Sequence, residues 1–155
     1  MRAGIALGSN LGDRHAQLKS AISGLRNLHE GGEFLTSSFY KTEPQDCPPN
    51  SPSFLNAVIE METSLAPLVL LGHLQAIEER AGRPKSHGFH TPRNLDLDIL
   101  YCDLLELEAD ELQLPHPRIR ERSFVLIPLC EIRPDLILPG WEGNCQYYLS
   151  RNSSI

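Results

Sequence analysis

The apolar residues of this 155-residue chain alternate between two spacings, and the order of those spacings restricts the fold. An apolar residue at every second position predicts a strand, and one at every third or fourth position predicts a helix with one apolar stripe. Strands are predicted at 2–8, 33–41, 54–62 and 95–101. A helix is predicted after the first and after the third of these segments, which gives the order strand, helix, strand, strand, helix, strand.

The two predicted helices have recognisable ends. Asp13 is expected to cap the first, which stops at the glycine pair 31–32. Ser64, followed by Pro67 in the first turn, is expected to begin the second, which stops at Gly82. Two helices on one side of an antiparallel sheet in this order predict an α+β fold, a ferredoxin-like βαββαβ sandwich.

The remaining segments are less regular. Four prolines in 43–53 predict a long surface loop. Residues 111–155 are expected to be C-terminal additions: a short strand, a helix after Pro117 that is broken near Pro128, and a polar tail that the pattern leaves open. The length fits a single domain over residues 1–155.

Charge narrows the classes of ligand. The formal net charge of −6 would repel a nucleic-acid backbone, so no nucleic-acid partner is expected. Half of the fourteen basic residues, however, fall in the short stretches 80–93 and 118–122. That clustering predicts a local anion site on an acidic protein.

Cysteine use and hydropathy predict a cytoplasmic protein without a membrane partner. The four cysteines form no CxxC pair and are expected to be free thiols. The opening residues turn polar too early for a secretory leader, and no apolar run is long enough to cross a bilayer.

The most specific chemical feature is the pair Asp96 and Asp98. Side chains two apart on a strand point to the same side, so both carboxylates are placed to bind a hard divalent cation. The alternative is an ordinary solvated strand face. Aspartate is disfavoured in strands, and the nearby Arg83, Lys85 and Arg93 favour a combined metal and phosphate site.

Two neighbouring segments have a functional and a plain interpretation. The stretch 83–94 joins the second helix to the aspartate strand and is interpreted as a lid over phosphates, with a solvated connector as the alternative. Residues 8–13 contain no Walker or dinucleotide-binding motif, so a tight turn is the safer interpretation. Any bound ATP would then be held by the lid, the metals and the basic residues.

Three residues outside these segments are further candidates. His116 lies close to Arg118, Arg120 and Arg122, where it can donate to a phosphate or serve only the structure. Phe54 and Phe124 are core residues on general grounds, and they can stack on a flat heterocycle only if a pocket lies between them.

Five segments in order resemble the 6-hydroxymethyl-7,8-dihydropterin pyrophosphokinases of folate synthesis. They are IALGSNLGD at the start, SSFYKTEP at 37–44, FLNAVIEMET at 54–63, PRNLDLDIL at 92–100 and LPHPRIRERSFVLIPLCEI at 114–132. The resemblance implies a ferredoxin-like core, two Mg²⁺ ions, and attack by the pterin hydroxymethyl oxygen on the β-phosphorus of ATP, with AMP leaving. It implies a monomer that acts on ATP and a reduced pterin.

The resemblance also implies roles for individual residues. Asp96 and Asp98 would bind both metal ions, and Arg83 and Arg93 would neutralise developing charge. The nucleotide contacts would be Gln75, Glu78, Lys85, Ile99, His116 and Arg122. The pterin site would be Thr42, Phe54, Asn56 and Phe124.

The chain departs from the family pattern in the lid, with Phe89-His90-Thr91 before Pro92-Arg93 and Asn94 after it, and Phe54 stands where tyrosine is frequent. The lid departure puts loop closure in question rather than the chemistry. The main alternative function is a non-catalytic pterin- or nucleotide-binding homologue. A metal-dependent phosphohydrolase, which the two carboxylates would permit, is a further alternative. A ferredoxin-like RNA-binding domain is a weaker one, because it conflicts with the acidity.

Overall fold

The structure is a computed structural model that describes residues 1–43, 53–82 and 95–152. The segments 44–52, 83–94 and 153–155 lie outside the described residues. Three of the predicted site residues, Arg83, Lys85 and Arg93, and the predicted lid therefore belong to an undescribed segment.

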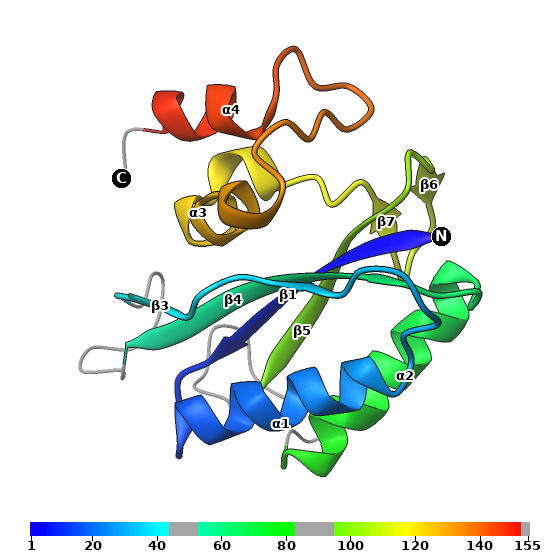
Figure 1. Ribbon diagram of the computed structural model, residues 1–155, viewed down its shortest axis with the longest axis vertical. Coiled ribbons are helices and arrows are strands. Elements are labelled where there is room, and N and C mark those ends of the chain that lie inside the picture. The colour runs from blue at the N-terminus through cyan, green and yellow to red at the C-terminus, as the bar shows by residue number, and fades with distance from the viewer. Residues whose placement is uncertain (44–52, 83–94, 153–155) are drawn as a thin grey trace.

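The predicted order of elements is confirmed (Figure 1). The first part of the chain contains β1 (Arg2–Ser9), α1 (Arg14–Arg26), β2 (Leu35–Thr36), β3 (Tyr40–Thr42), β4 (Phe54–Glu62), α2 (Pro67–Arg80) and β5 (Asp96–Cys102). The second part contains β6 (Leu107–Glu108), β7 (Gln113–Leu114), a 3₁₀ turn η1 (Ile119–Glu121), α3 (Ser123–Ile132) and α4 (Cys145–Arg151). Among the described residues, no helix is both long enough and apolar enough to cross a lipid bilayer.

One antiparallel sheet carries the fold. Its strand order is β2-β4-β1-β5, and β3 also pairs with β4. Helices α1 and α2 cover one face, while α3 and α4 lie over the other (Figure 1). The arrangement is an α+β, ferredoxin-like sandwich with C-terminal additions, as the periodicity predicted.

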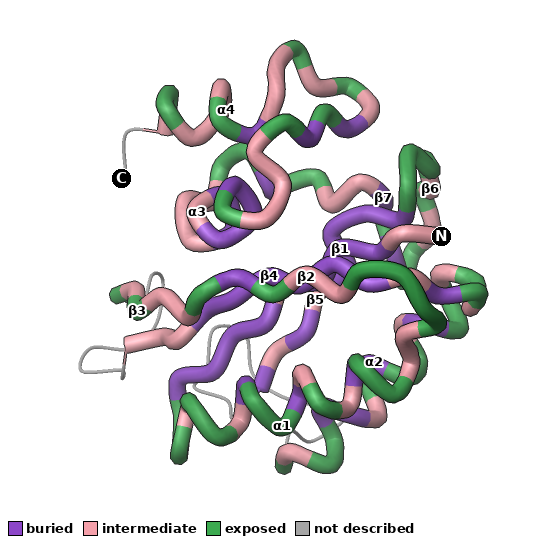
Figure 2. Tube along the Cα trace, in the orientation of Figure 1, coloured by how far each residue is buried: buried purple, intermediate pink, exposed green. Residues whose placement is uncertain are grey.

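Apolar side chains fill both sides of the sheet. Ile5, Leu18 and Leu74 belong to the core between the sheet and α1 and α2, and Val58 and Leu126 belong to the core between the sheet and α3. The two central strands are accordingly buried along most of their length (Figure 2). The C-terminal additions therefore complete a second hydrophobic layer.

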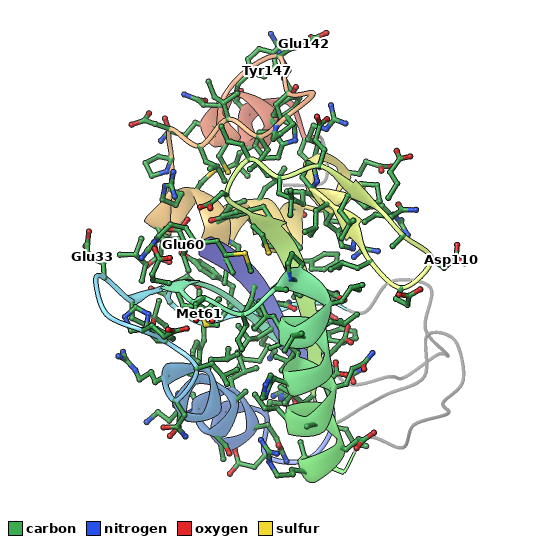
Figure 3. All side chains as sticks on the ribbon, turned by 90° about the vertical axis from the view of Figure 1, so that its right-hand side faces the viewer. Glu33, Glu60, Met61, Asp110, Glu142 and Tyr147 are labelled. Atoms are coloured by element: carbon green, nitrogen blue, oxygen red, sulfur yellow. The ribbon has the colours of Figure 1, made fainter. Side chains whose placement is uncertain are left out.

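This second layer also covers the polar face of β4. Residues 56–61 are all buried, because α3 lies over the face that carries Asn56 and Glu60. Figure 3 shows the neighbours Glu60 and Met61 on opposite sides of the strand, Glu60 towards α3 and Met61 towards α1 and α2. Glu60 is 1% exposed and accepts hydrogen bonds from Tyr101 Oη at 2.6 Å, from Arg2 and from Arg133.

The prediction of a single strand at 33–41 is wrong, because β2 and β3 are separate strands. Between them, the backbone N–H of Ser37 donates to the carbonyl of Val58, and the N–H of Val58 donates to Ser37 Oγ, each at 2.9 Å. The serine hydroxyl thus replaces a carbonyl of the ladder, so regular pairing stops there and resumes at Tyr40.

Two helix boundaries differ from prediction. Helix α1 ends at Arg26, before the glycine pair 31–32. The cap of α2 is Ala66 rather than Ser64, whose hydroxyl instead contacts the carboxylate of Glu30. Pro67 does open the helix, and Gly82 ends it with a positive φ of 98°. As predicted, Asp13 caps α1 by accepting from the N–H of Ala16 at 3.1 Å.

Helix α3 is not broken near Pro128, because it continues to Ile132. Proline removes only the one hydrogen bond that would reach the first turn of this helix, and its ring is buried. The tail left open by the pattern contains α4, whose cap Asn144 accepts from the N–H of Tyr147 at 2.9 Å.

Candidate active site

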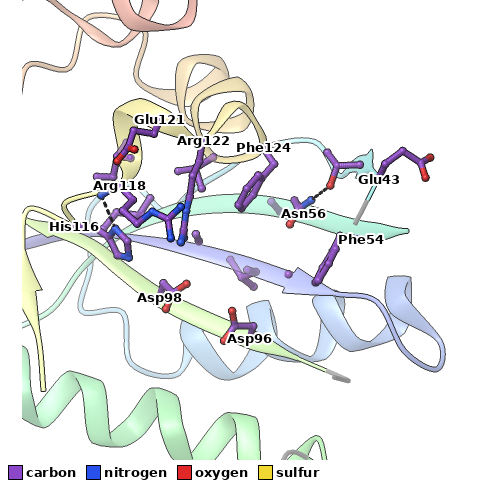
Figure 4. A pocket seen from close by; sticks show the side chains of 18 residues that line it. Glu43, Phe54, Asn56, Asp96, Asp98, His116, Arg118, Glu121, Arg122 and Phe124 are labelled. Carbon is purple, nitrogen blue, oxygen red and sulfur yellow. Dashed lines mark hydrogen bonds between the residues drawn. The ribbon is translucent and has the colours of Figure 1, made fainter. Parts of the chain in front are cut away.

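A pocket lies between the α3-facing side of the sheet and the segment that runs from His116 into α3 (Figure 4). Side chains from β1, β3, β4 and β5 form its floor, and residues 116–125 form its opposite wall. Eight of the predicted site residues line it together: Thr42, Phe54, Asn56, Asp96, Asp98, His116, Arg122 and Phe124.

The acidic part of the pocket is on β5. Asp96 and Asp98 are half-buried on the pocket face, between Leu95, Leu97 and Ile99, which are buried on the other face. Both carboxylates point from the strand into the space below Arg122 and His116 (Figure 4). Their partners in the register are small, since Ala6 lies opposite Asp98 and Gly8 opposite Asp96. Little side-chain bulk therefore crowds the carboxylates.

These carboxylates fit a hard divalent cation, because both donors are oxygens on one face and remain accessible from the pocket. Within residues 1–43, 53–82 and 95–152, no three His, Cys, Asp or Glu side chains gather as a metal-binding group. An ion held here by Asp96 and Asp98 would complete its coordination with water or with oxygens of a bound phosphate.

Glu78 fixes the beginning of the aspartate strand. Its buried carboxylate accepts a hydrogen bond from the backbone N–H of Leu97 at 2.7 Å, between the two aspartates. Neither Glu78 nor the exposed Gln75 lines the pocket. Ile99 lies on the other side of β5, where it lines a second hollow that shares Asp98 and His116 with the first pocket.

The basic part of the pocket faces the carboxylates. Burial, then the nearby Arg118, lowers the pKa of Arg122, while Asp98 and Asp96 act in the opposite direction. The Arg122 guanidinium also lies 5.6 Å from the centroid of the Phe124 ring, close enough for a cation–π contact. A phosphate entering between Arg122 and the aspartates would satisfy this partly buried cation.

His116 is held in one orientation and one tautomer. Its backbone N–H donates to the carbonyl of Leu100 at 2.8 Å, and its Nδ1 accepts from the N–H of Arg118 at 3.1 Å. Nε2 therefore carries the hydrogen in the neutral ring. Burial, with Arg122 and Arg118, lowers the pKa of His116 to about 4, so at neutral pH the ring is an uncharged N–H donor.

This pKa makes stability depend on pH. Because the folded pKa lies below the unfolded value, the unfolded chain binds the extra proton as pH falls, and the folded state loses stability between about pH 6.5 and 4. The contribution of His116 between pH 7 and 5 is expected to be about 1 to 2 kcal/mol. Urea unfolding of the metal-free protein at both pH values measures it.

His116→Asn is the matched variant, since the asparagine oxygen can replace Nδ1 as the acceptor for Arg118. Its loss of stability from pH 7 to 5 should be smaller than that of the wild type. An equal loss in the two proteins would contradict the expected role of His116.

The other end of the pocket suits a flat polar ring. Phe54, from the start of β4, and Phe124, from the first turn of α3, lie at this end (Figure 4). Between them, the buried Asn56 donates from Nδ2 to Thr42 Oγ1 at 2.6 Å. This hydrogen bond fixes the amide and leaves its remaining groups to read a hydrogen-bonding edge.

Gly8 is a pocket residue that the sequence interpretation placed at the end of the first strand and in the turn after it, without a role in the site. A Cβ atom at this position would lie 3.1 Å from Asn56 Oδ1, so glycine keeps the amide oxygen uncovered. A glycine inside a strand is the available signal, because such a residue often marks the close approach of a ligand. Glu43, Arg118 and Glu121 also line the pocket without having been assigned a role.

Solved structures place the fold in a known class. The chain superposes on the crystal structure of Plasmodium falciparum HPPK-DHPS, wild type with SDX-DHP, with a TM-score of 0.72 and 14% sequence identity. The match covers 97% of this chain and 44% of that one, so this chain spans less than half of the solved protein. This similarity supports the α+β fold and nothing more specific.

Sequence comparison then gives the family. Residues 4–134 match the family of 7,8-dihydro-6-hydroxymethylpterin-pyrophosphokinases (HPPK). The chain is 42% identical over 136 residues to a 2-amino-4-hydroxy-6-hydroxymethyldihydropteridine pyrophosphokinase of Haemophilus influenzae, covering 88% of this chain and 84% of the relative. It is 41% identical over 138 residues to the protein of the same name from Pseudomonas aeruginosa, with 89% and 84% covered. This chain belongs to the HPPK family.

Proposed function

We propose that this chain transfers pyrophosphate from ATP to the hydroxymethyl group of 6-hydroxymethyl-7,8-dihydropterin in folate biosynthesis and releases AMP. Family membership supports the reaction. The observation that carries it to this chain is the single pocket in which a carboxylate pair and a guanidinium adjoin an end lined by two aromatic rings and an amide. A pterin binder without turnover needs only the aromatic end of that pocket, not the carboxylates and the guanidinium.

The aromatic end is the proposed pterin site. Phe54 and Phe124 would stack on the ring, and Asn56, held by Thr42, would hydrogen-bond its edge. This orientation directs the hydroxymethyl group along the pocket towards the aspartates. The order of these groups along the pocket in Figure 4 supports it.

The charged end and the adjoining hollow are the proposed nucleotide site. Asp96 and Asp98 would hold Mg²⁺, two ions by family resemblance, and Arg122 and His116 would contact phosphate oxygens. Ile99 would contact the base, since its hollow shares Asp98 and His116 with the pocket. The remaining proposed contacts come from the resemblance: Gln75, Glu78 and Lys85 to the nucleotide, and Arg83 and Arg93 to the transferring group.

The residues of the pocket would act by aligning the reacting oxygens and by stabilising the negative charge of the phosphates. Bound Mg²⁺ supplies Lewis-acid stabilisation of phosphate charge. Asp96 and Asp98 fix where that charge is held, and His116 donates a hydrogen bond at neutral pH without adding a positive charge. Phosphoryl transfer needs no protein nucleophile when both oxygens are held in line. The pocket wall formed by residues 116–125 would help to exclude water from the reacting groups.

We further propose that residues 1–155 act as one catalytic domain and as a cytoplasmic monomer without nucleic-acid or membrane partners. The net charge of −6 supports the absence of a nucleic-acid partner. The cores on the two faces of one sheet support a single folding unit.

Incubation with ATP and Mg²⁺, with and without the reduced pterin, tests the proposed reaction. A pyrophosphokinase makes AMP only when pterin is present. A phosphohydrolase releases phosphate from ATP without pterin, and a sensor makes neither product, so either result would replace the proposal.

The stacking role predicts a selective defect. Phe124→Ala is expected to raise the KM for pterin at least about tenfold, because a stacked, buried aromatic ring contributes roughly 1.5 to 3 kcal/mol. The KM for ATP should rise less, since the one described link between the ring and the nucleotide residues is the cation–π contact with Arg122. Steady-state kinetics measure both constants. Phe39→Ala, a half-buried phenylalanine outside the pocket, is the control, and equal changes in both constants would contradict stacking.

A further inference from the structure

Outside the pocket, the carboxylate of Glu131 joins β3 to α3, the two elements beside the proposed pterin end of the pocket. Oε1 of Glu131, near the end of α3, accepts from the backbone N–H of Ser38 at 2.8 Å and from Tyr40 Oη at 2.7 Å. Oε2 accepts from Ser38 Oγ at 2.9 Å. Burial alone would raise the pKa of Glu131, but the hydrogen bonds from Tyr40 and Ser38 together lower it. We call Ser38, Tyr40 and Glu131 the β3–α3 latch.

The latch is built on the faces that carry the pterin residues. On β3, Tyr40 and Thr42 are two residues apart and share a face, and they lie opposite Asn56 and Phe54 in the register. On α3, Phe124 and Glu131 are seven residues apart, which places both on one side of the helix. The Tyr40–Glu131 hydrogen bond therefore connects the strand face of Thr42 to the helix face of Phe124.

The strand has few other restraints. Within the described residues, β3 is three residues long and pairs only with β4, and the break around Ser37 separates it from β2. Helix α3 is anchored beyond its end by Arg133, which donates to Glu60. The helix is thus fixed to the sheet separately, and the latch fixes the edge strand to the helix.

We propose that Glu131 is a positioning residue, which through Ser38 and Tyr40 sets the separation between β3 and α3 and thereby the affinity for the pterin ring. This inference rests on the proposed function, because the proposed function places the pterin ring at the end of the pocket lined by Thr42 of β3 and Phe124 of α3. A ring stacked on Phe124 of α3 must also reach Asn56, whose amide is held by Thr42 of β3. Both contacts form only when β3 and α3 are at a matched distance. The nucleotide end depends less on this separation, since none of its pocket residues comes from β3.

Kinetics of Glu131 variants test the latch. Glu131→Ala is expected to raise the KM for pterin about five- to tenfold, while kcat and the KM for ATP stay within about twofold. Glu131→Gln should restore the wild-type KM, because the amide oxygen can accept from Ser38 N and Tyr40 Oη, and the amide nitrogen can donate to Ser38 Oγ. Tyr40→Phe should give an intermediate KM, and the double variant with Glu131→Ala should be no worse than Glu131→Ala alone.

Matched controls are Glu106→Ala and Tyr147→Phe, which change an exposed glutamate and a tyrosine outside the pocket. The thermal midpoint of each variant shows whether the fold is intact. An unchanged pterin KM in Glu131→Ala overturns the proposal, and so does a parallel rise in the KM for ATP, which is the result of general loosening.

Calorimetric titration with oxidised 6-hydroxymethylpterin separates this proposal from the proposed function, because it requires no turnover. If the wild type binds this pterin but makes no AMP, the proposed function fails, and the Kd of Glu131→Ala alone decides the latch. A Kd raised about five- to tenfold supports it, and an unchanged Kd overturns it.

Discussion

Asp98→Asn should lower kcat on the order of 10³-fold while the Kd for ATP rises less than about tenfold. The asparagine keeps the size of the side chain and its place on the pocket face of β5, but it removes one of two negative charges proposed to hold Mg²⁺. Charge on the phosphate oxygens grows towards the transition state, so loss of metal stabilisation affects turnover more than ground-state binding. Single-turnover measurements of AMP formation and calorimetric titration with a non-hydrolysable ATP analogue give the two quantities.

Asp135→Asn is the control, because Asp135 is exposed and lies outside the pocket. It should leave both quantities unchanged. If Asp98→Asn weakened turnover and nucleotide binding equally, Asp98 would be contributing to uniform binding, and its proposed role in the transition state would be wrong.

Glu60→Gln is expected to lower the free energy of unfolding by about 2 to 3 kcal/mol, without a direct effect on the site. Glu60 is the common acceptor for Tyr101, Arg2 and Arg133, and a glutamine offers one acceptor oxygen and no charge to these donors. Burial, together with Glu60, raises the pKa of Tyr101, so its hydroxyl remains a donor. The arginines are partly exposed and can regain some hydration, which keeps the expected loss at the lower end for buried charges.

Urea unfolding at pH 7 measures this loss, and Glu108→Gln on the exposed part of β6 is the control. A change below about 0.5 kcal/mol in Glu60→Gln would contradict the role of Glu60 in joining β1, β5 and the end of α3.

Local pattern predicted the order of the main elements, because burial on one side leaves a period in the sequence. It failed where a distant segment changed the environment. The alternation in β4 does not indicate that α3, from more than sixty residues further along the chain, buries Asn56 and Glu60. No property of residues 54–62 alone signals that cover.

Other differences have local causes that general preferences did not capture. The Ser37 hydroxyl interrupts the strand by pairing with Val58, a specific contact that outweighs an average propensity. Helix α3 continues through Pro128 because the proline removes only one hydrogen bond, near the start of the helix.

The candidate site was more predictable than these details, because its residues belong to recognisable motifs. The structure brings Asp96, Asp98, His116 and Arg122 to one pocket, although the aspartates and the other two come from separate segments. Gly8 and Glu131 were missed for different reasons. A glycine in a strand does give a signal, whereas nothing in the sequence around Glu131 indicates its hydrogen bonds to Ser38 and Tyr40.

The floor of the pocket and its opposite wall are made at different times during synthesis. The strands that carry Asn56, Asp96 and Asp98 leave the ribosome before residues 116–125, which supply His116, Arg122 and Phe124. A nascent chain that ends before this segment can present the carboxylates proposed to hold Mg²⁺ but lacks one wall of the proposed pterin site. It also leaves Val58 and Leu100 without their cover from α3. Pterin should therefore protect only the completed chain from proteolysis, and a chaperone should bind the shorter one.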